Sequence, residues 1–246
     1  MADYQGFAQY YDDMMWDVNY DKWFAYLDGL IHDNGGAASI LDCACGTCEL
    51  TRRFKTAGYE VSGFDLSKDM LTQAQAKLRS MGLSIPLFCM DLRDFSVHHG
   101  VDALCCGCDG VNYLKELSDV ERFFDRAYSA LKPNGLLLFD VSSRYKLEKI
   151  IGEGCFSDVS EDYAYIWQNR LNKRRHVVTM ELCFFVSEGE LYRRFDETHV
   201  QRAHSVKELC LALHEHGFSD IKTYEAFTMD EPGNKSERIQ FVCRRR

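Results

Sequence analysis

The sequence of 246 residues lacks three features that would indicate a membrane, secreted or nucleic-acid-binding protein. No run approaches the roughly 20 consecutive apolar residues that a membrane-spanning helix needs. The start, MADYQGFAQYYDD, has neither the basic nor the apolar segment of a secretory signal. Basic side chains are outnumbered 29 to 38, and a net charge of −9 repels phosphate backbones. We therefore expect a cytoplasmic protein with no membrane contact and no nucleic-acid partner, whose eleven cysteines are reduced thiols.

Short apolar runs alternate with amphipathic segments along most of the chain. The expected strands are 38–43, 59–65, 85–91, 101–106, 135–142, 218–228 and 238–245. The expected helices are 3–33, 49–58, 67–82, 117–132 and 206–217. Repeated strand–helix units predict right-handed crossovers, and strands that are apolar throughout predict a sheet covered by helices on both faces. The expected fold class is α/β, with a mostly parallel seven-stranded sheet flanked by helices.

The alternation is interrupted after residue 150. Three segments there alternate apolar and polar residues, as strands of antiparallel hairpins do: 162–171, 176–187 and 190–205. We expect an inserted antiparallel β subdomain at 151–203, within a main domain made of 1–150 and 204–246. The period of a strand puts Glu197, His199 and Gln201 on one face of the insertion and Arg202 on the other.

Acidic residues follow four of the expected parallel strands: Asp42, Asp65, Asp91 and Asp109. Ligands of open parallel sheets bind beyond the carboxyl ends of the strands. Asp65 is placed to accept hydrogen bonds from both hydroxyls of a ribose, and Asp91 to accept one from an adenine amino group. Each acid alone is better explained as a helix cap or a solvated residue. Their occurrence at four successive strand ends indicates a nucleoside ligand.

The turn after the first strand, DCACGTC at 42–48, resembles the first motif of class I S-adenosylmethionine-dependent methyltransferases, an acidic residue followed by x-G-x-G-x-G. Asp42 and Gly46 match this motif, whereas Ala44 and Cys48 stand where glycine is common. The resemblance covers about 38–142 and the final strands. It implies a Rossmann-like fold and S-adenosylmethionine as the cofactor. A nicotinamide dinucleotide is the weaker alternative, because the turn lacks the G-x-G-x-x-G fingerprint.

The resemblance extends to a set of cofactor contacts. Asp42, Ala44, Gly46, Asp65, Leu66, Asp91, Leu92 and Cys108 lie at or just after the matching strand ends, and Met70 lies on the inner face of the expected helix 67–82. We add Tyr11 and Trp23 from the aromatic N-terminal segment, which also holds Tyr4, Tyr10, Trp16 and Tyr20. Aromatic faces suit a cationic sulfonium. The pairs Cys45/Cys48 and Cys105/Cys108 have C-x-x-C spacing, but thiols within apolar strands behave as small hydrophobes. We therefore expect no metal.

The segment after the fourth strand bears on the acceptor. Methyltransferases of exocyclic base or glutamine amides carry a D/N-P-P-Y/F/W motif there, and this chain has only Pro86, Pro133 and Pro232. The insertion and the YYDD start resemble bacterial small-molecule methyltransferases, including nucleotide-amino-sugar N-methyltransferases, in which a histidine occupies the position of Tyr113. The expected catalytic residues are Tyr11, Tyr113 and His199, and the expected substrate-binding residues are Asp109, Asn112, Glu197 and Arg202.

Two functions remain open at this point. The first is an enzyme that methylates N or O of a small soluble metabolite, with the insertion as a lid over the acceptor pocket. The second is a non-catalytic module that senses S-adenosylmethionine or S-adenosylhomocysteine. The insertion has an alternative use as the contact of a homodimer.

Overall fold

The computed structural model describes residues 8–15 and 17–246 and contains two separate sheets. The larger has seven strands in the order β10-β11-β5-β4-β1-β2-β3. Their bounds are β1 (Ser39–Cys43), β2 (Glu60–Asp65), β3 (Leu87–Cys89), β4 (Val101–Cys106), β5 (Leu131–Ser142), β10 (Phe218–Glu225) and β11 (Arg238–Arg245). Strand β11 runs antiparallel to both of its neighbours, and the pairs from β5 to β3 are parallel. The expected Rossmann-like sheet is therefore confirmed.

Helices cover both faces of this sheet, because successive residues of its strands alternate between two apolar layers. The helices are α2 (Tyr20–Asp33), α3 (Glu49–Thr56), α4 (Lys68–Ser80), α5 (Leu117–Ala130) and α6 (Val206–Glu215). Leu41 and Leu104 face a core layer closed by α5 and α6, whereas Ile40 and Ala103 face a layer closed by α2 and α3. Among the helices of the described residues, none has the length and apolar character required to cross a bilayer.

The N-terminal segment is not the continuous helix expected over 3–33. A short helix α1 (Tyr11–Met14) precedes α2, and Asn19 separates them by accepting a hydrogen bond from Lys22 N at 2.8 Å, which caps α2. Tyr4 and Trp16 lie outside the described residues.

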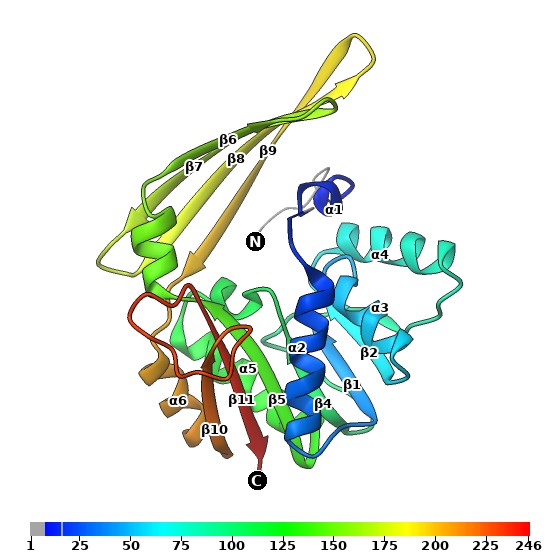
Figure 1. Cartoon of the computed structure of the whole chain (residues 1–246), viewed down its shortest axis with the longest axis vertical. Helices are drawn as coiled ribbons and strands as arrows, with labels where there is room; N and C mark the ends of the chain where they lie inside the picture. Colours follow the sequence, from blue (N-terminus) through cyan, green and yellow to red (C-terminus); the bar gives the residue numbers. More distant parts are fainter. Residues whose placement is uncertain (1–7, 16) are drawn as a thin grey trace.

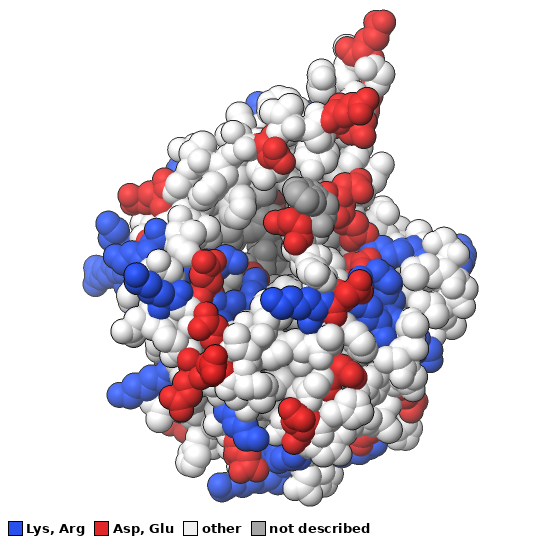
Figure 2. Space-filling view, viewed as in Figure 1, with Lys and Arg blue, Asp and Glu red and all other residues white. Residues whose placement is uncertain are grey.

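The second sheet has four antiparallel strands and rises from the carboxyl ends of the parallel strands, opposite the end where the chain terminates (Figure 1). Its strands are β6 (Cys155–Val159), β7 (Tyr163–Asn172), β8 (Val177–Glu188) and β9 (Leu191–Arg202). Strand β6 was not predicted, because all five of its residues are exposed and show no apolar period. Acidic side chains gather along the outer end of this sheet (Figure 2), where the last residues of β6 and β8 and the turns after them carry Asp158, Glu161, Asp162, Glu188 and Glu190.

The inner face of the four-stranded sheet is half apolar and half polar. Strand β8 buries every second residue, and Val178, Met180 and Leu182 pack in a cluster with Met70 of α4 and Leu147. Strand β9 pairs its own polar residues with these positions: Gln201 opposite Val178, His199 opposite Met180 and Glu197 opposite Leu182. This polar column is buried, so the sheet presents hydrogen-bonding groups to the space above the parallel strands.

Candidate active site

A small cleft lies at the carboxyl ends of β1 and β4. Its walls are residues 44–47, Glu49 and Leu50 after β1, Gly107 and Cys108 after β4, and Tyr11 and Tyr20 from the N-terminal helices, with Asp42 below. We call this cavity the strand-end cleft. The space-filling view shows the molecule hollowed between the four-stranded sheet and this edge (Figure 2).

The turn after β1 takes its shape from three residues with left-handed backbone. Ala44, Gly46 and Cys48 have φ values of 53°, 53° and 67°, at the positions where the methyltransferase motif favours glycine. The Cys48 side chain is fully buried with Ala74 and Leu78 of α4, so it leaves the cleft open and does not crowd it. Cys45 and Cys48 hold their sulfur atoms 3.7 Å apart, as packed thiols.

Two of the predicted acids shape the cleft. Asp65 accepts hydrogen bonds from Gly46 N and Ser67 N, both at 2.8 Å, and burial raises the pKa of its carboxyl. It therefore braces the turn at the side of β2. Asp42 is buried and accepts a 2.5 Å hydrogen bond from Thr51 Oγ1. Burial raises the pKa of Asp42 to about 7, because the charged form is poorly solvated.

The other predicted cofactor residues are more dispersed. Asp91 accepts hydrogen bonds from Arg93 Nε at 2.9 Å and Nη2 at 2.6 Å, and this guanidinium lowers the pKa of its carboxyl. Leu66 is exposed, Leu92 packs at the edge of the α5–α6 layer, and Met70 belongs to the cluster under the four-stranded sheet. Tyr11 and Cys108 line the cleft, whereas Trp23 lies in the core, 5.2 Å from the ring of Phe227.

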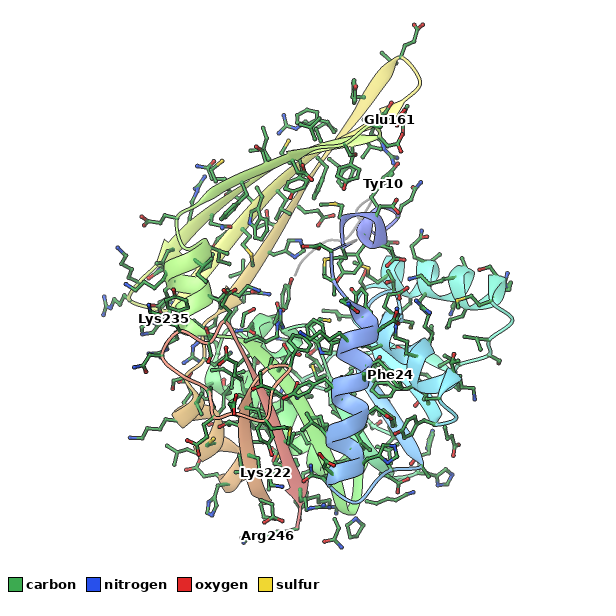
Figure 3. All side chains as sticks on the ribbon, viewed as in Figure 1. Tyr10, Phe24, Glu161, Lys222, Lys235 and Arg246 are labelled. Carbon is green, nitrogen blue, oxygen red and sulfur yellow. The ribbon has the colours of Figure 1, made fainter. Side chains whose placement is uncertain are left out.

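Helix α1 joins the cleft to the four-stranded sheet, which sequence patterns did not reveal. Asp12 accepts a 2.6 Å hydrogen bond from Thr47 Oγ1 of the turn and pairs with Lys77 of α4. On the other side, Tyr10 points from α1 toward the sheet (Figure 3) and stacks on Phe195 of β9 with ring centroids 6.1 Å apart. Burial raises the pKa of the neighbouring Tyr11 well above its usual value.

Tyr113 and His199 meet across the two sheets. Tyr113 ends the 3-10 helix η1 (Gly110–Tyr113) after β4, and its Oη lies 3.2 Å from Nδ1 of His199 on β9. The histidine is 6% exposed, and burial lowers its pKa to about 4. The imidazole is thus neutral at pH 7, and the structure brings together two of the three residues predicted to be catalytic. Tyr113 contributes, after burial, to the raised pKa of Tyr11, so the third predicted residue lies near this pair.

Asp109 lies at the centre of a buried charge network. Its Oδ1 accepts from Arg238 Nη2 and its Oδ2 from Gln201 Nε2 of β9, both at 2.6 Å. Arg238 also pairs with Asp140, and its guanidinium stands 4.8 Å from the Trp23 ring centroid. We call Asp109, Asp140, Arg238 and Gln201 the strand-end network. Asp140 and Arg238 were not predicted as site residues from the sequence, because their partners are about 30 to 130 residues away in the chain.

The remaining predicted substrate residues have different surroundings. Asn112 is fully buried; its Nδ2 donates to the carbonyl oxygens of Ser142 and Arg202, and its Oδ1 accepts from Ser142 N at 2.9 Å. The Arg202 side chain lies on the other face of β9 and pairs with Glu208 at 3.0 Å. Glu197 is buried on the inner face, in line with His199.

Comparisons with known proteins agree with this geometry. Residues 40–135 match a family model described as a methyltransferase domain. The chain is 40% identical to "Putative methyltransferase YqeM" of Bacillus subtilis (strain 168), over 98% of this chain and 97% of that protein. It is 30% identical to an S-adenosylmethionine-dependent methyltransferase from Clostridium acetobutylicum ATCC 824, with a TM-score of 0.90 and 98% of both chains covered.

A third match concerns the fold alone. The S-adenosylmethionine-bound structure of an amino pentose methyltransferase from Micromonospora echinaspora has 22% identity and a TM-score of 0.75, and the match covers 93% of this chain and 92% of that one. The four-stranded sheet lies within the matched length, so it is included in the shared architecture.

Proposed function

Because this chain belongs to the S-adenosylmethionine-dependent methyltransferases, we propose that it methylates a nitrogen or oxygen atom of a small metabolite, held between the strand-end cleft and the four-stranded sheet. The observation that carries the proposal is the 3.2 Å contact between Tyr113 and His199, which joins the segment after β4 to strand β9 of the four-stranded sheet. A non-catalytic sensor would not need a buried neutral imidazole at this point.

The residues of the cleft fit the cofactor. The left-handed backbone at Ala44 and Gly46 turns the chain sharply after β1, and a Cβ added at Gly46 would meet no atom within 4 Å, so there is open space against this backbone. Asp65 beside the turn is the group that would accept from the ribose hydroxyls, and Asp42 lies where a cationic amino group would favour its charged form. Tyr11 and Tyr20 would offer aromatic surface to a sulfonium.

S-adenosylmethionine supplies an electrophilic methyl group when it is bound, and the protein has to orient a nucleophile and exclude water. Neutral His199 is suited to hold an acceptor N–H or O–H. If its Nδ1–H donates to Tyr113 Oη, Nε2 carries the lone pair that accepts from the substrate. Tyr113 would then determine the tautomer and the direction of the ring.

A nitrogen acceptor is the first choice within this proposal. A pKa of about 4 makes His199 a weak base, and a neutral amine attacks before it loses a proton, whereas a hydroxyl group has to be deprotonated as it reacts. The fold likeness to an amino pentose methyltransferase is in keeping with an amine. A protein or polynucleotide acceptor fits less well, because α1 and the four-stranded sheet enclose the site from above.

A homodimer contact stays the alternative use of the four-stranded sheet. Val159, Leu191 and Tyr192 at its outer end are between 66% and 78% exposed, and they are the apolar residues that such a contact would bury.

Release of S-adenosylhomocysteine from S-adenosylmethionine, measured against fractionated pools of small amines and alcohols, tests the proposal. With an active acceptor, we expect His199→Asn and Tyr113→Phe to lower kcat by up to about 100-fold, since misplacement of an acceptor by about 1 Å costs on that order. Arg170→Met, at an exposed ion pair of β7, serves as the control and should keep full turnover. Absence of turnover with every pool, while calorimetry shows intact cofactor binding, would favour the non-catalytic sensor.

A further inference from the structure

We propose that Gln201 and Asp109 are positioning residues that couple the seating of the four-stranded sheet to the occupancy of the strand-end cleft. The inference rests on the proposed role of that sheet as the cover of the acceptor site. It concerns the protein's own contacts, so it is testable without an acceptor.

The direct link is one short hydrogen bond. Gln201 near the end of β9 donates from Nε2 to Asp109 Oδ2 at 2.6 Å, and its side chain is buried on the inner face of the sheet. Asp109 immediately follows Cys108, a wall residue of the cleft. A movement of β9 therefore pulls on the residue next to the cleft wall.

The backbone makes this link stiff. Cys108 and Asp109 are consecutive non-glycine residues with φ values of 55° and 53°, a conformation that L side chains adopt only when their surroundings hold them in it. The surroundings here are Asp140, which accepts from Asp109 N at 3.1 Å, and Arg238, which pairs with both carboxylates. With its other carboxylate oxygen bound to Gln201, Asp109 has one set of partners in the parallel sheet and one in β9.

Coupling of this kind is reciprocal. A ligand that packs against Cys108 favours one arrangement of the 108–109 backbone, and that arrangement presents Asp109 to Gln201. Occupancy of the cleft should then reduce the motion of β9 and slow the exchange of its amides. Removal of the Gln201 donor should weaken ligand binding, even though Gln201 is not among the residues that line the cleft.

Hydrogen exchange of the β9 amides, with and without S-adenosylhomocysteine, tests the inference on the full chain. In the wild type we expect the ligand to slow exchange at residues 198–202 by about fivefold or more, within the usual range of site-to-site coupling. Gln201→Leu should abolish this protection and weaken the calorimetric Kd by a similar factor. Gln201→Met keeps the length of the side chain and has no donor, so it should behave like the leucine variant.

Thr198→Val is the matched control, because Thr198 lies on the exposed face of the same strand. It should keep both the protection and the affinity. Equal protection of β9 in wild type and in both Gln201 variants would overturn the coupling. If Gln201→Leu lowered the melting temperature strongly, Gln201→Met would decide, and wild-type affinity with unchanged protection in that variant would also overturn it. Lack of turnover with any acceptor would count against the proposed function and leave this result unaffected.

Discussion

The two sheets differ in how their residues are buried. Strand β1 of the parallel sheet buries four of its five residues, and its two faces belong to two apolar layers. Strand β6 of the other sheet exposes all five. The parallel sheet thus acts as a rigid support whose strand ends and backbone turns form the cleft, a geometry that many side chains could maintain. The four-stranded sheet contributes through individual side chains on one face.

In the proposed function, the turn after β1 and the strand-end carboxylates hold the cofactor, and side chains of β9 hold the acceptor. Ala44, Gly46 and Cys48 shape the cleft through their left-handed φ values. His199, Gln201 and Glu197 would act through the functional groups that β9 buries on its inner face. The strand-end network joins the parallel sheet to β9 of the four-stranded sheet.

Replacement of Arg238 by methionine should have the largest effect. It leaves the carboxylates of Asp109 and Asp140 buried without their cation, which costs roughly 3–5 kcal/mol of unfolding free energy. Urea denaturation measures this loss. The control is Arg170→Met at the exposed pair with Glu181, which should cost less than about 1 kcal/mol. Similar small losses in both variants would mean that the network contributes no more than a surface pair.

The pH dependence of stability should reveal His199. Its pKa is lowered from 6.5 to about 4 in the folded protein, so between these values the unfolded chain takes up the proton first. Stability due to the neutral imidazole is present above pH 6.5 and falls as the pH drops to 4, by up to about 3 kcal/mol. The difference in unfolding free energy between wild type and His199→Asn isolates this contribution from the carboxylates. A difference that stays constant from pH 7 to 4 would show that the imidazole is solvated.

Cofactor affinity should depend on Asp42. With a pKa of about 7, its carboxyl is half protonated at neutral pH in the free protein, and the ammonium group of S-adenosylhomocysteine favours the carboxylate. Affinity should therefore fall as the pH drops below 7, approaching tenfold, or about 1.4 kcal/mol, per pH unit. Calorimetry from pH 8 to 5.5 measures the slope, and Asp42→Asn should remove it. An equally steep slope in that variant would place the titrating group elsewhere.

Replacement of Ala44 by glycine should have the smallest effect, and it should be stabilising. Relief of a left-handed φ of 53° outweighs the extra freedom of the unfolded chain by roughly 0.5 kcal/mol. Ala76→Gly in the exposed interior of α4 is the opposite control and should destabilise by about 1 kcal/mol. Thermal melts of both variants would give shifts of opposite sign, and a loss of stability in both would contradict the account of the turn.

The sequence allowed the parallel sheet to be predicted strand by strand, because buried strands are apolar throughout and their turns carry glycine and acids. The expected strands 38–43 and 101–106 differ from β1 and β4 by at most one residue. Strand β6 and the break before α2 were missed. The residues of β6 are all exposed, so they show no apolar period. The cap at Asn19 starts α2 within the range 3–33 that was expected to form one helix.

The site was predictable only where residues act close to their own strand ends. Asp42 and Asp65 border the turn as expected, and alternation along β9 correctly grouped Glu197, His199 and Gln201. The contacts that cross the molecule were not predictable, since no local pattern marks them. Arg238 to Asp109 and Tyr113 to His199 are pairs of this kind, separated by 129 and 86 residues.

The amide of Asn112 fastens the insertion at its base. It binds the backbone of Ser142, where the chain leaves the parallel sheet, and that of Arg202, where it returns. One buried side chain thereby closes the intervening residues into a loop whose two ends are held at a single point of the parallel sheet. Loss of this amide would therefore loosen both ends of the insertion at once.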